Sequence, residues 1–215
     1  MRKNILFDLD GTLTDPFEGI TNSVIYSLKK FGIEESDKQK LKCFIGPPLY
    51  KSFMVEYSLS RSDALKAVDY YREYYADKGI FENFLYDGIK ETLEFLSERG
   101  NFLYVATSKP KIFAEKILRH FDISKYFRFV AGATLDSSLV EKSDIIKFAI
   151  EENNIDVSHA VMIGDRKHDI LGAKQNKIKS IGVLYGYGTF EELSAAGADA
   201  FAEKPNSIIR EIEII

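Results

Sequence analysis

Five short apolar runs along the chain have the composition of buried parallel strands: Ile5–Phe7, Phe102–Ala106, Phe127–Val130, Ala160–Ile163 and Ser180–Val183. Apolar residues at helical spacing predict helices over Ile89–Arg99, Ile112–Phe121 and Ile145–Glu152. Strands that alternate with helices predict an α/β fold, with a doubly wound, mainly parallel, Rossmann-like sheet.

A long segment without a convincing strand separates the first apolar run from the second. Between Thr14 and Tyr86 the pattern is helical and rich in Tyr, Phe and Lys. Roughly 70 residues are too many for an ordinary connection. We therefore expect an all-helical cap domain, residues 15–85, inserted into a catalytic core formed by residues 1–14 and 86–215. Asp15-Pro16 and Asp87-Gly88 are the expected hinges.

Composition narrows the class of protein. The 215 residues are 45% hydrophobic and 29% charged, as in an ordinary globular chain, and the formal net charge is −4. This charge gives no sign of general affinity for nucleic acid or for anionic membranes. The apolar run before Asp8 is too short for a signal peptide, and no stretch approaches the roughly 20 apolar residues of a membrane span. We expect a cytoplasmic protein, monomer or homodimer, with no nucleic-acid or membrane partner.

Polar residues that could take part in catalysis or binding follow the predicted strands. In an open α/β sheet, ligands bind at the carboxyl ends of the strands, so residues just after the strands meet in one crevice. Each signal alone is weak, and their shared location carries the argument. The residues are Asp8, Asp10, Thr107, Ser108, Lys109, Lys142, Asp165 and Asp169.

Asp8 and Asp10 are suited to two separate catalytic roles. A carboxylate directly after an apolar strand is costly unless it is paired or functional. One acid can attack phosphorus while the other exchanges protons with the leaving group and water. Gly11 permits a tight backbone path beside them. A turn capped by two aspartates is the alternative for this motif taken alone.

Asp165 and Asp169 would add carboxylates opposite Asp8, which makes a pocket rich in oxygen. Such a pocket suits Mg²⁺ better than zinc, and a cation would neutralise both the clustered anions and a phosphoryl substrate. Asp165 could also cap the following helix. His168, within the same motif, is expected to be an exposed helix residue and not a ligand.

Thr107 and the backbone N–H of Ser108 are suited to binding phosphoryl oxygens, although a simple turn after a strand is the alternative. Lys142 would place a positive charge beside the nucleophile and the transferring group. Lys109 competes for that role. Pro110 would start the next helix, which we expect to turn Lys109 toward the cap or solvent.

Four motifs in this order resemble those of the haloacid dehalogenase superfamily of phosphohydrolases. The first is Phe7-Asp8-Leu9-Asp10-Gly11-Thr12-Leu13 and the second is Thr107-Ser108-Lys109. Lys142 matches the third motif, and Gly164-Asp165 through Asp169 matches the fourth. The resemblance spans essentially the whole chain, because the helical insert is similar to the family's cap. Lys142 is followed by Ser143-Asp144 where many relatives have Pro-x-Pro, which puts the local loop shape in doubt.

The resemblance implies a role for each matching position. Asp8 would form an aspartyl-phosphate, and Asp10 would be the general acid and base. Asp8, the Asp10 carbonyl and Asp165 would bind Mg²⁺, with Asp169 in support. Thr107, Ser108 and Lys142 would hold the phosphoryl group.

Two further segments resemble particular branches of the superfamily. Ile45-Gly46-Pro47-Pro48-Leu49 is similar to the cap loop of phosphoglycolate phosphatases. The run from Val161 through Gly188, which includes Tyr185-Gly186-Tyr187-Gly188, is similar to bacterial 5'-nucleotidase-like enzymes. These resemblances imply a small phosphorylated metabolite as substrate, either phosphoglycolate or a nucleoside 5'-monophosphate. Gly46, Lys51 and Lys109 are candidate substrate contacts.

Two other functions remain open from the sequence. A sugar phosphomutase of the β-phosphoglucomutase type shares the Asp-x-Asp core, but it has a histidine where this chain has Ile20. A receiver domain also carries a phosphorylated Asp at a strand end, but it is short and has no helical insert. The many aromatic residues of the insert could stack on a nucleobase. We expect that most of them fill the core of a small helical bundle.

Overall fold

The computed structural model describes residues 2–136 and 138–215. The chain forms two compact units. The first unit runs up to Asp15 and resumes at Leu85, and the second comprises Pro16–Phe84. These boundaries differ by one residue from the limits of the insert expected from the sequence.

A six-stranded sheet forms the centre of the first unit, in the order β5-β4-β1-β6-β7-β8. Each strand is parallel to its neighbours. The predicted α/β fold with a parallel sheet is therefore confirmed. The strands are β1 (Asn4–Phe7), β4 (Phe102–Pro110), β5 (Phe127–Ala133), β6 (Ala160–Gly164), β7 (Lys179–Val183) and β8 (Ala200–Ala202).

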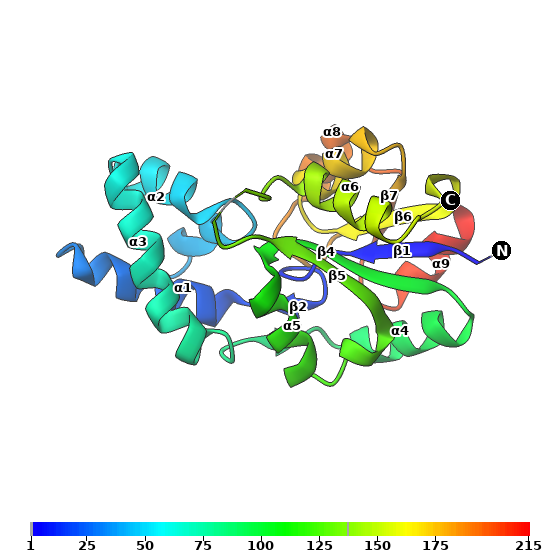
Figure 1. The fold of residues 1–215 in the computed structure, drawn as a ribbon, viewed down its shortest axis with the longest axis horizontal. Coiled ribbons are helices and arrows are strands. Elements are labelled where there is room, and N and C mark those ends of the chain that lie inside the picture. The colour runs from blue at the N-terminus through cyan, green and yellow to red at the C-terminus, as the bar shows by residue number, and fades with distance from the viewer. Residues whose placement is uncertain (1, 137) are drawn as a thin grey trace. The chain divides into compact units, whose positions relative to one another are not determined.

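Six helices of this unit cover both faces of the sheet. Figure 1 shows α6, α7 and α8 on one side and α4, α5 and α9 on the other. The helix α6 starts at Lys142, three residues before the start of the helix expected from the sequence. The helices are α4 (Ile89–Glu98), α5 (Lys111–His120), α6 (Lys142–Glu152), α7 (Lys167–Gln175), α8 (Phe190–Ala196) and α9 (Ser207–Ile214).

The apolar core explains why the sheet is buried on both faces. Leu6, Met162 and Ala106 from neighbouring strands pack with Ile145 and Ile146 of α6 in one cluster. Strands buried on both faces need continuous apolar runs, which is the pattern seen in the sequence. The sheet is thus a rigid platform for the residues that follow its strands.

The second unit is built from three α-helices: α1 (Phe17–Lys30), α2 (Leu49–Tyr57) and α3 (Arg61–Tyr74). Two short helical turns, Lys40–Phe44 and Tyr75–Gly79, complete it. Four aromatic residues of the insert are buried in its core: Phe44, Phe53, Tyr71 and Tyr75. Tyr50, Tyr57, Tyr70 and Tyr74 are half-buried.

Two short strands, β2 (Thr14–Asp15) and β3 (Phe84–Leu85), pair where the chain leaves the first unit and returns to it. The return is also held within the first unit, because the N–H of Tyr86 donates to the carbonyl of Leu13 over 3.2 Å. The exit and the return of the chain are therefore adjacent at the edge of the core.

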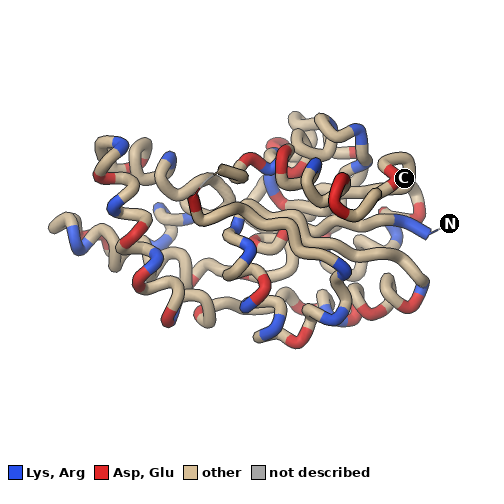
Figure 2. The backbone as a smooth tube through the Cα atoms, viewed as in Figure 1, with Lys and Arg blue, Asp and Glu red and all other residues tan. Residues whose placement is uncertain are grey.

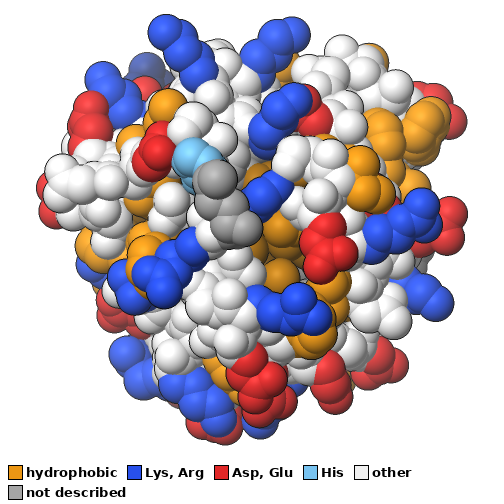
Figure 3. All heavy atoms as spheres, turned by 90° about the vertical axis from the view of Figure 1, so that its right-hand side faces the viewer, with side chains coloured by type: hydrophobic (Ala, Val, Ile, Leu, Met, Phe, Trp, Pro, Cys, Tyr) orange, Lys and Arg blue, Asp and Glu red, His pale blue; other side chains and the backbone are white. Residues whose placement is uncertain are grey.

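Charged residues of both signs are spread along the chain, as Figure 2 shows. On the face seen in Figure 3, lysine and arginine side chains are interspersed with aspartate and glutamate. Among the described residues, we find no helix that combines the length and the apolar character needed to cross a membrane.

Candidate active site

The loop after β1 places two carboxylates at the edge of the sheet. Phe7 is aligned with Val105 of β4 and with Ile163 of β6. The N–H of Asp8 continues the ladder by donating to the carbonyl of Ile163 over 2.9 Å. The Asp8 side chain therefore starts from a fixed backbone position.

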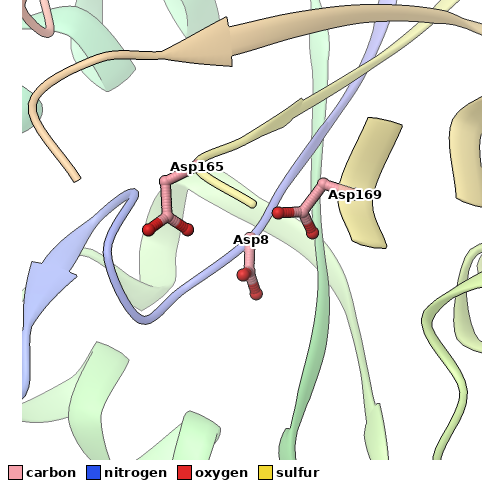
Figure 4. Close-up of side chains that lie close together, drawn as sticks. All are labelled: Asp8, Asp165 and Asp169. Atoms are coloured by element: carbon pink, nitrogen blue, oxygen red, sulfur yellow. The ribbon is translucent and has the colours of Figure 1, made fainter. Parts of the chain in front are cut away.

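Three aspartates converge beside this loop. One carboxylate oxygen from each of Asp8, Asp165 and Asp169 lies within 4.8 Å of the other two. Figure 4 shows the three side chains close together, with Asp8 after β1, Asp165 after β6 and Asp169 on α7. All three residues are buried. The predicted grouping of these aspartates is present in the fold.

Lys142 enters the same cluster from the start of α6. Its Nζ lies 2.8 Å from Asp8 Oδ1 and 2.8 Å from Asp169 Oδ1. It also donates to the carbonyl of Ala106 over 3.0 Å. Burial by itself lowers the pKa of Lys142, but the carboxylates of Asp169 and Asp8 raise it above its ordinary value. This ammonium group therefore stays charged at physiological pH.

Asp10 is paired with a different lysine. Lys109 Nζ forms a short ion pair with Asp10 Oδ2, and Lys109 is only 8% exposed. The expectation that Lys109 turns toward the cap or solvent is therefore wrong. The strand β4 continues to Pro110, with an irregularity of the ladder between Thr107 and Pro110, and Lys109 is buried within this stretch. The buried ammonium group of Lys109 is satisfied by the nearest carboxylate.

Burial raises the pKa of Asp10, although the charge of Lys109 opposes this shift. A carboxyl group with a raised pKa keeps a proton to higher pH, which is what a general acid needs. The Oδ1 atom of Asp10 is buried, and none of the described residues makes a hydrogen bond to it. That oxygen is free to act on a reacting group.

The metal candidates also carry perturbed carboxyl groups. Burial raises the pKa of Asp165 well above its ordinary value, and the charges of Asp169 and Asp8 add to the shift. Burial raises the pKa of Asp169 to about 6, with a contribution from Asp8. Clustered, buried carboxylates therefore repel one another and hold protons unless a cation joins them.

These residues fit a divalent cation. Asp8, Asp10, Asp165 and Asp169 carry four negative charges, against two positive charges on Lys109 and Lys142. The cluster is thus formally −2 when all groups are ionised. Asp165 Oδ1 is buried and accepts no hydrogen bond from the residues that the structure describes, so it has an open coordination position. A hard cation with oxygen ligands, such as Mg²⁺, matches this donor set.

Gly11 lets the loop after β1 pass the metal candidates. Its φ is +83°, which L side chains rarely adopt. A Cβ atom at this position would lie 2.2 Å from Asp165 Oδ2. The close approach of the loop to Asp165 therefore requires glycine.

The remaining candidates lie in two places. Thr107 is buried beside the lysines, and its Oγ1 accepts a hydrogen bond from the N–H of Lys109 over 3.2 Å. Ser108 is half-buried. Gly46 and Lys51 belong to the second unit, where Lys51 is exposed. His168 is exposed and outside the aspartate group, as expected.

Sequence reasoning missed one partner of the site. The N–H of Tyr187, in the loop after β7, donates to Asp165 Oδ2 over 2.8 Å. The Tyr-Gly-Tyr-Gly run was identified only as a resemblance to a branch of the superfamily. Two glycines that alternate with tyrosines are a signal of close backbone approach, and that signal could have pointed to this contact.

Comparisons with known proteins agree on one family. The model of the haloacid dehalogenase-like hydrolase family matches residues 5–183. The chain is 48% identical over 192 residues to a 5'-nucleotidase of Pseudomonas aeruginosa, which covers 89% of this chain and 87% of that protein. It is 29% identical over 220 residues to a phosphoglycolate phosphatase of Vibrio parahaemolyticus, covering 99% and 96% of the two chains.

A relative with another name and a solved structure complete the comparison. The tyrosine-protein kinase PtkA of Mycobacterium tuberculosis is 38% identical over 184 residues, which cover 86% of this chain and 62% of that protein. The crystal structure of a predicted phosphatase from Clostridium acetobutylicum has a TM-score of 0.96 and 47% identity, with both chains covered completely. The chain therefore belongs to the haloacid dehalogenase-like hydrolase family, and it is an enzyme of the phosphatase type.

Proposed function

We propose that this phosphatase hydrolyses a small phosphomonoester through an aspartyl-phosphate on Asp8, with Mg²⁺ as cofactor. The observation that carries the proposal is the buried convergence of Asp8, Asp165 and Asp169 around Lys142. Asp10 lies on the same loop as Asp8, is paired with Lys109 of β4, and supplies the second carboxyl group. A nucleophile, a proton-transfer group and an oxygen-rich cation site are then all present.

The first half of the reaction forms a bond between a carboxylate oxygen of Asp8 and phosphorus. The bond between phosphorus and the ester oxygen breaks, and the protonated Asp10 gives its proton to that oxygen. Lys142 fixes the Asp8 carboxylate and places positive charge beside the phosphoryl oxygens. Thr107 and the N–H of Ser108 would hold the same oxygens from the end of β4.

The second half regenerates the enzyme. Asp10, now ionised, takes a proton from a water molecule as that water attacks phosphorus. The bond between phosphorus and Asp8 breaks, and inorganic phosphate leaves. Lys109 stabilises the ionised form of Asp10 between the two halves. Mg²⁺, held by Asp8, Asp165 and the Asp10 carbonyl with Asp169 in support, would supply positive charge that stabilises the transferring group.

The substrate we favour is a nucleoside 5'-monophosphate. The 5'-nucleotidase relative is 48% identical, whereas the phosphoglycolate phosphatase relative is 29% identical. Phosphoglycolate is therefore the second candidate. Half-buried aromatic residues of the second unit, such as Tyr50 and Tyr70, would be available to stack on a base. Gly46 and Lys51 stay candidate substrate contacts of that unit.

Two alternatives carry less support. The family match and the phosphatase relatives argue against a receiver-type switch. A phosphomutase would need a second proton-transfer group in the insert. At the position where that relative has histidine, this chain has Ile20, a buried apolar residue of α1. Ile20 cannot transfer a proton.

The test is a substrate panel with purified protein in the presence of Mg²⁺. Nucleoside 5'-monophosphates, phosphoglycolate and hexose phosphates are compared by kcat/KM, with phosphate release as the readout. We expect the highest kcat/KM for a nucleoside 5'-monophosphate. A higher kcat/KM for phosphoglycolate would overturn the proposed substrate but would still agree with the proposed phosphomonoester hydrolysis. Isomerisation of a hexose phosphate without net phosphate release would favour the mutase.

A further inference from the structure

The loop Leu184–Gly188, here called the tyrosine loop, follows β7 and lies against the catalytic loop. A Cβ atom on Gly186 would lie 2.3 Å from the carbonyl oxygen of Gly11 and 2.4 Å from Asp165 Cβ. The hydroxyl of Tyr185 donates to the carbonyl of Thr12 over 2.9 Å. The tyrosine loop therefore touches both the Asp-x-Asp loop and the metal candidate Asp165.

Tyr187 contacts three parts of the core, one of which is the side chain of Tyr86. Its main-chain N–H donates to Asp165 Oδ2 over 2.8 Å. Its hydroxyl donates in a short hydrogen bond to Oδ1 of Asp15. Asp15 is the last residue of the first unit before the chain enters the insert. A single residue thus joins a metal candidate to the exit of the chain.

The Tyr187 hydroxyl is the donor in its bond to Asp15, whose carboxylate oxygen accepts. A hydrogen bond to an ionised carboxylate is among the stronger side-chain contacts.

The same loop also touches the return of the chain. The ring of Tyr86, the second residue after the chain re-enters the first unit, packs edge-to-face on Tyr185 with ring centroids 5.0 Å apart. The exit and the return are paired with each other as β2 and β3. The tyrosine loop therefore contacts both the exit and the return of the chain.

We propose that Tyr187 is a positioning residue that fixes the exit of the chain at Asp15 and orients the Asp165 carboxylate for the cation. The Asp165 half rests on the proposed function, whereas the Asp15 half does not. With the phenol in place, Asp165 Oδ2 is held by the N–H of Tyr187 and Oδ1 is left for the ion. Partners that orient a metal ligand commonly change metal affinity when they are removed.

The test uses Tyr187→Phe, which removes only the hydroxyl. Hydrogen exchange of the metal-free protein, read by mass spectrometry, should be about tenfold faster or more in the backbone of residues 14–17 and 84–87. Calorimetric titration with Mg²⁺ alone should show binding about tenfold weaker than in the wild type. Neither readout depends on turnover.

Three further variants separate a specific role from general packing. Tyr185→Phe removes a hydroxyl from the same loop that bonds Thr12 instead of Asp15, so exchange at residues 14–17 should match the wild type. Asp15→Asn keeps an acceptor for the Tyr187 phenol, so this variant should retain most of the wild-type protection from hydrogen exchange. Asp15→Leu removes the acceptor and should give the same faster exchange as Tyr187→Phe. The double variant Asp15→Leu/Tyr187→Phe should exchange no faster than either single variant.

The outcomes decide each half of the proposal. Wild-type exchange in both Tyr187→Phe and Asp15→Leu would overturn the Asp15 half. Faster exchange with unchanged Mg²⁺ affinity would overturn the link to Asp165. Equal effects of Tyr185→Phe and Tyr187→Phe would overturn a specific role for Tyr187. A wild-type protein that binds no Mg²⁺ would overturn the proposed cofactor and the Asp165 half, while exchange would still decide the Asp15 half.

Discussion

Lys142 Nζ lies 2.8 Å from Oδ1 of Asp8, and both side chains are almost completely buried. The same ammonium group lies 2.8 Å from Asp169 Oδ1. Lys142 therefore joins the proposed nucleophile to a proposed supporter of the metal site. A group in this position acts on catalysis and on the stability of the cluster at the same time.

Replacement of Lys142 by methionine should lower kcat/KM by a factor of about 10² to 10³, because preorganised positive charge beside the phosphoryl group is lost. It should also lower the free energy of unfolding by about 3–5 kcal/mol, because buried Asp8 and Asp169 lose their partner. Steady-state kinetics and urea unfolding measure the two effects. The matched control is Lys147→Met, an exposed lysine of the same helix, which should leave both values near wild type. Equal effects of the two substitutions would contradict the assigned role.

Asp10→Asn should separate the two proton transfers. With an alkyl phosphate, kcat should fall by about 10² to 10⁴, because the leaving oxygen receives no proton. With an aryl phosphate, whose leaving group needs less help, the phosphoenzyme should still form slowly and then persist. Rapid-quench measurements of phosphoenzyme and product follow both steps. Equal losses with alkyl and aryl substrates would count against Asp10 as the acid.

Lys109→Met should move the pH dependence attributed to Asp10. The first step needs protonated Asp10, so kcat/KM falls as pH rises through the pKa of this group. Burial already raises the pKa of Asp10, and the charge of Lys109 opposes that shift. Removal of Lys109 should therefore move the alkaline fall of kcat/KM to higher pH. A fall at the wild-type pH would show that another group controls it.

Metal-free protein should lose stability as pH rises from about 4 to about 6. Burial raises the pKa of Asp169 from an ordinary value of 3.8 to about 6, so the folded state binds more protons than the unfolded state in this window. Stability is then fully present below the unfolded pKa and lost as pH rises through the folded pKa. Mg²⁺ should stabilise the protein progressively more over the same range, because it competes with those protons. Thermal unfolding across this pH range, with EDTA or with Mg²⁺, measures this effect. Melting temperatures that change in parallel with pH in the two conditions would contradict the prediction.

Gly11→Ala should disturb the site by a steric clash as well as by backbone strain. Its Cβ would lie 2.2 Å from Asp165 Oδ2, in addition to the cost of a positive φ. Gly32→Ala is the matched control, because Gly32 has a φ of +71° and nothing within 4 Å of its Cβ position. We expect Gly32→Ala to cost about 1–2 kcal/mol of stability and to leave Mg²⁺ affinity unchanged. Gly11→Ala should cost more and weaken Mg²⁺ binding, as seen by calorimetry.

Long apolar runs and residues at strand ends could be predicted from the sequence, because both depend on local pattern. The five predicted runs became strands of the sheet, and Asp8, Asp165 and Asp169 meet where parallel strands end. The sixth strand, Ala200–Ala202, was not predicted. It is a short Ala-Phe-Ala segment at the edge of the sheet.

Contacts set by tertiary packing could not be predicted. The direction of Lys109 was inferred from Pro110, but β4 continues through Lys109, and this lysine is buried and paired with Asp10. The bond between Tyr187 and Asp15 joins residues 172 positions apart, and no local pattern encodes such a pair. The resemblance predicted a chemical role for each motif, and the fold shows which residues contact those motifs.

The most direct measurement is the mass spectrometry of acid-quenched enzyme, taken from turnover with a nucleoside 5'-monophosphate and Mg²⁺. We predict one phosphoryl group on the peptide that contains Asp8, and neither label nor turnover with Asp8→Asn. Full turnover by Asp8→Asn, or a phosphoryl group only on another peptide, would contradict nucleophilic catalysis by Asp8.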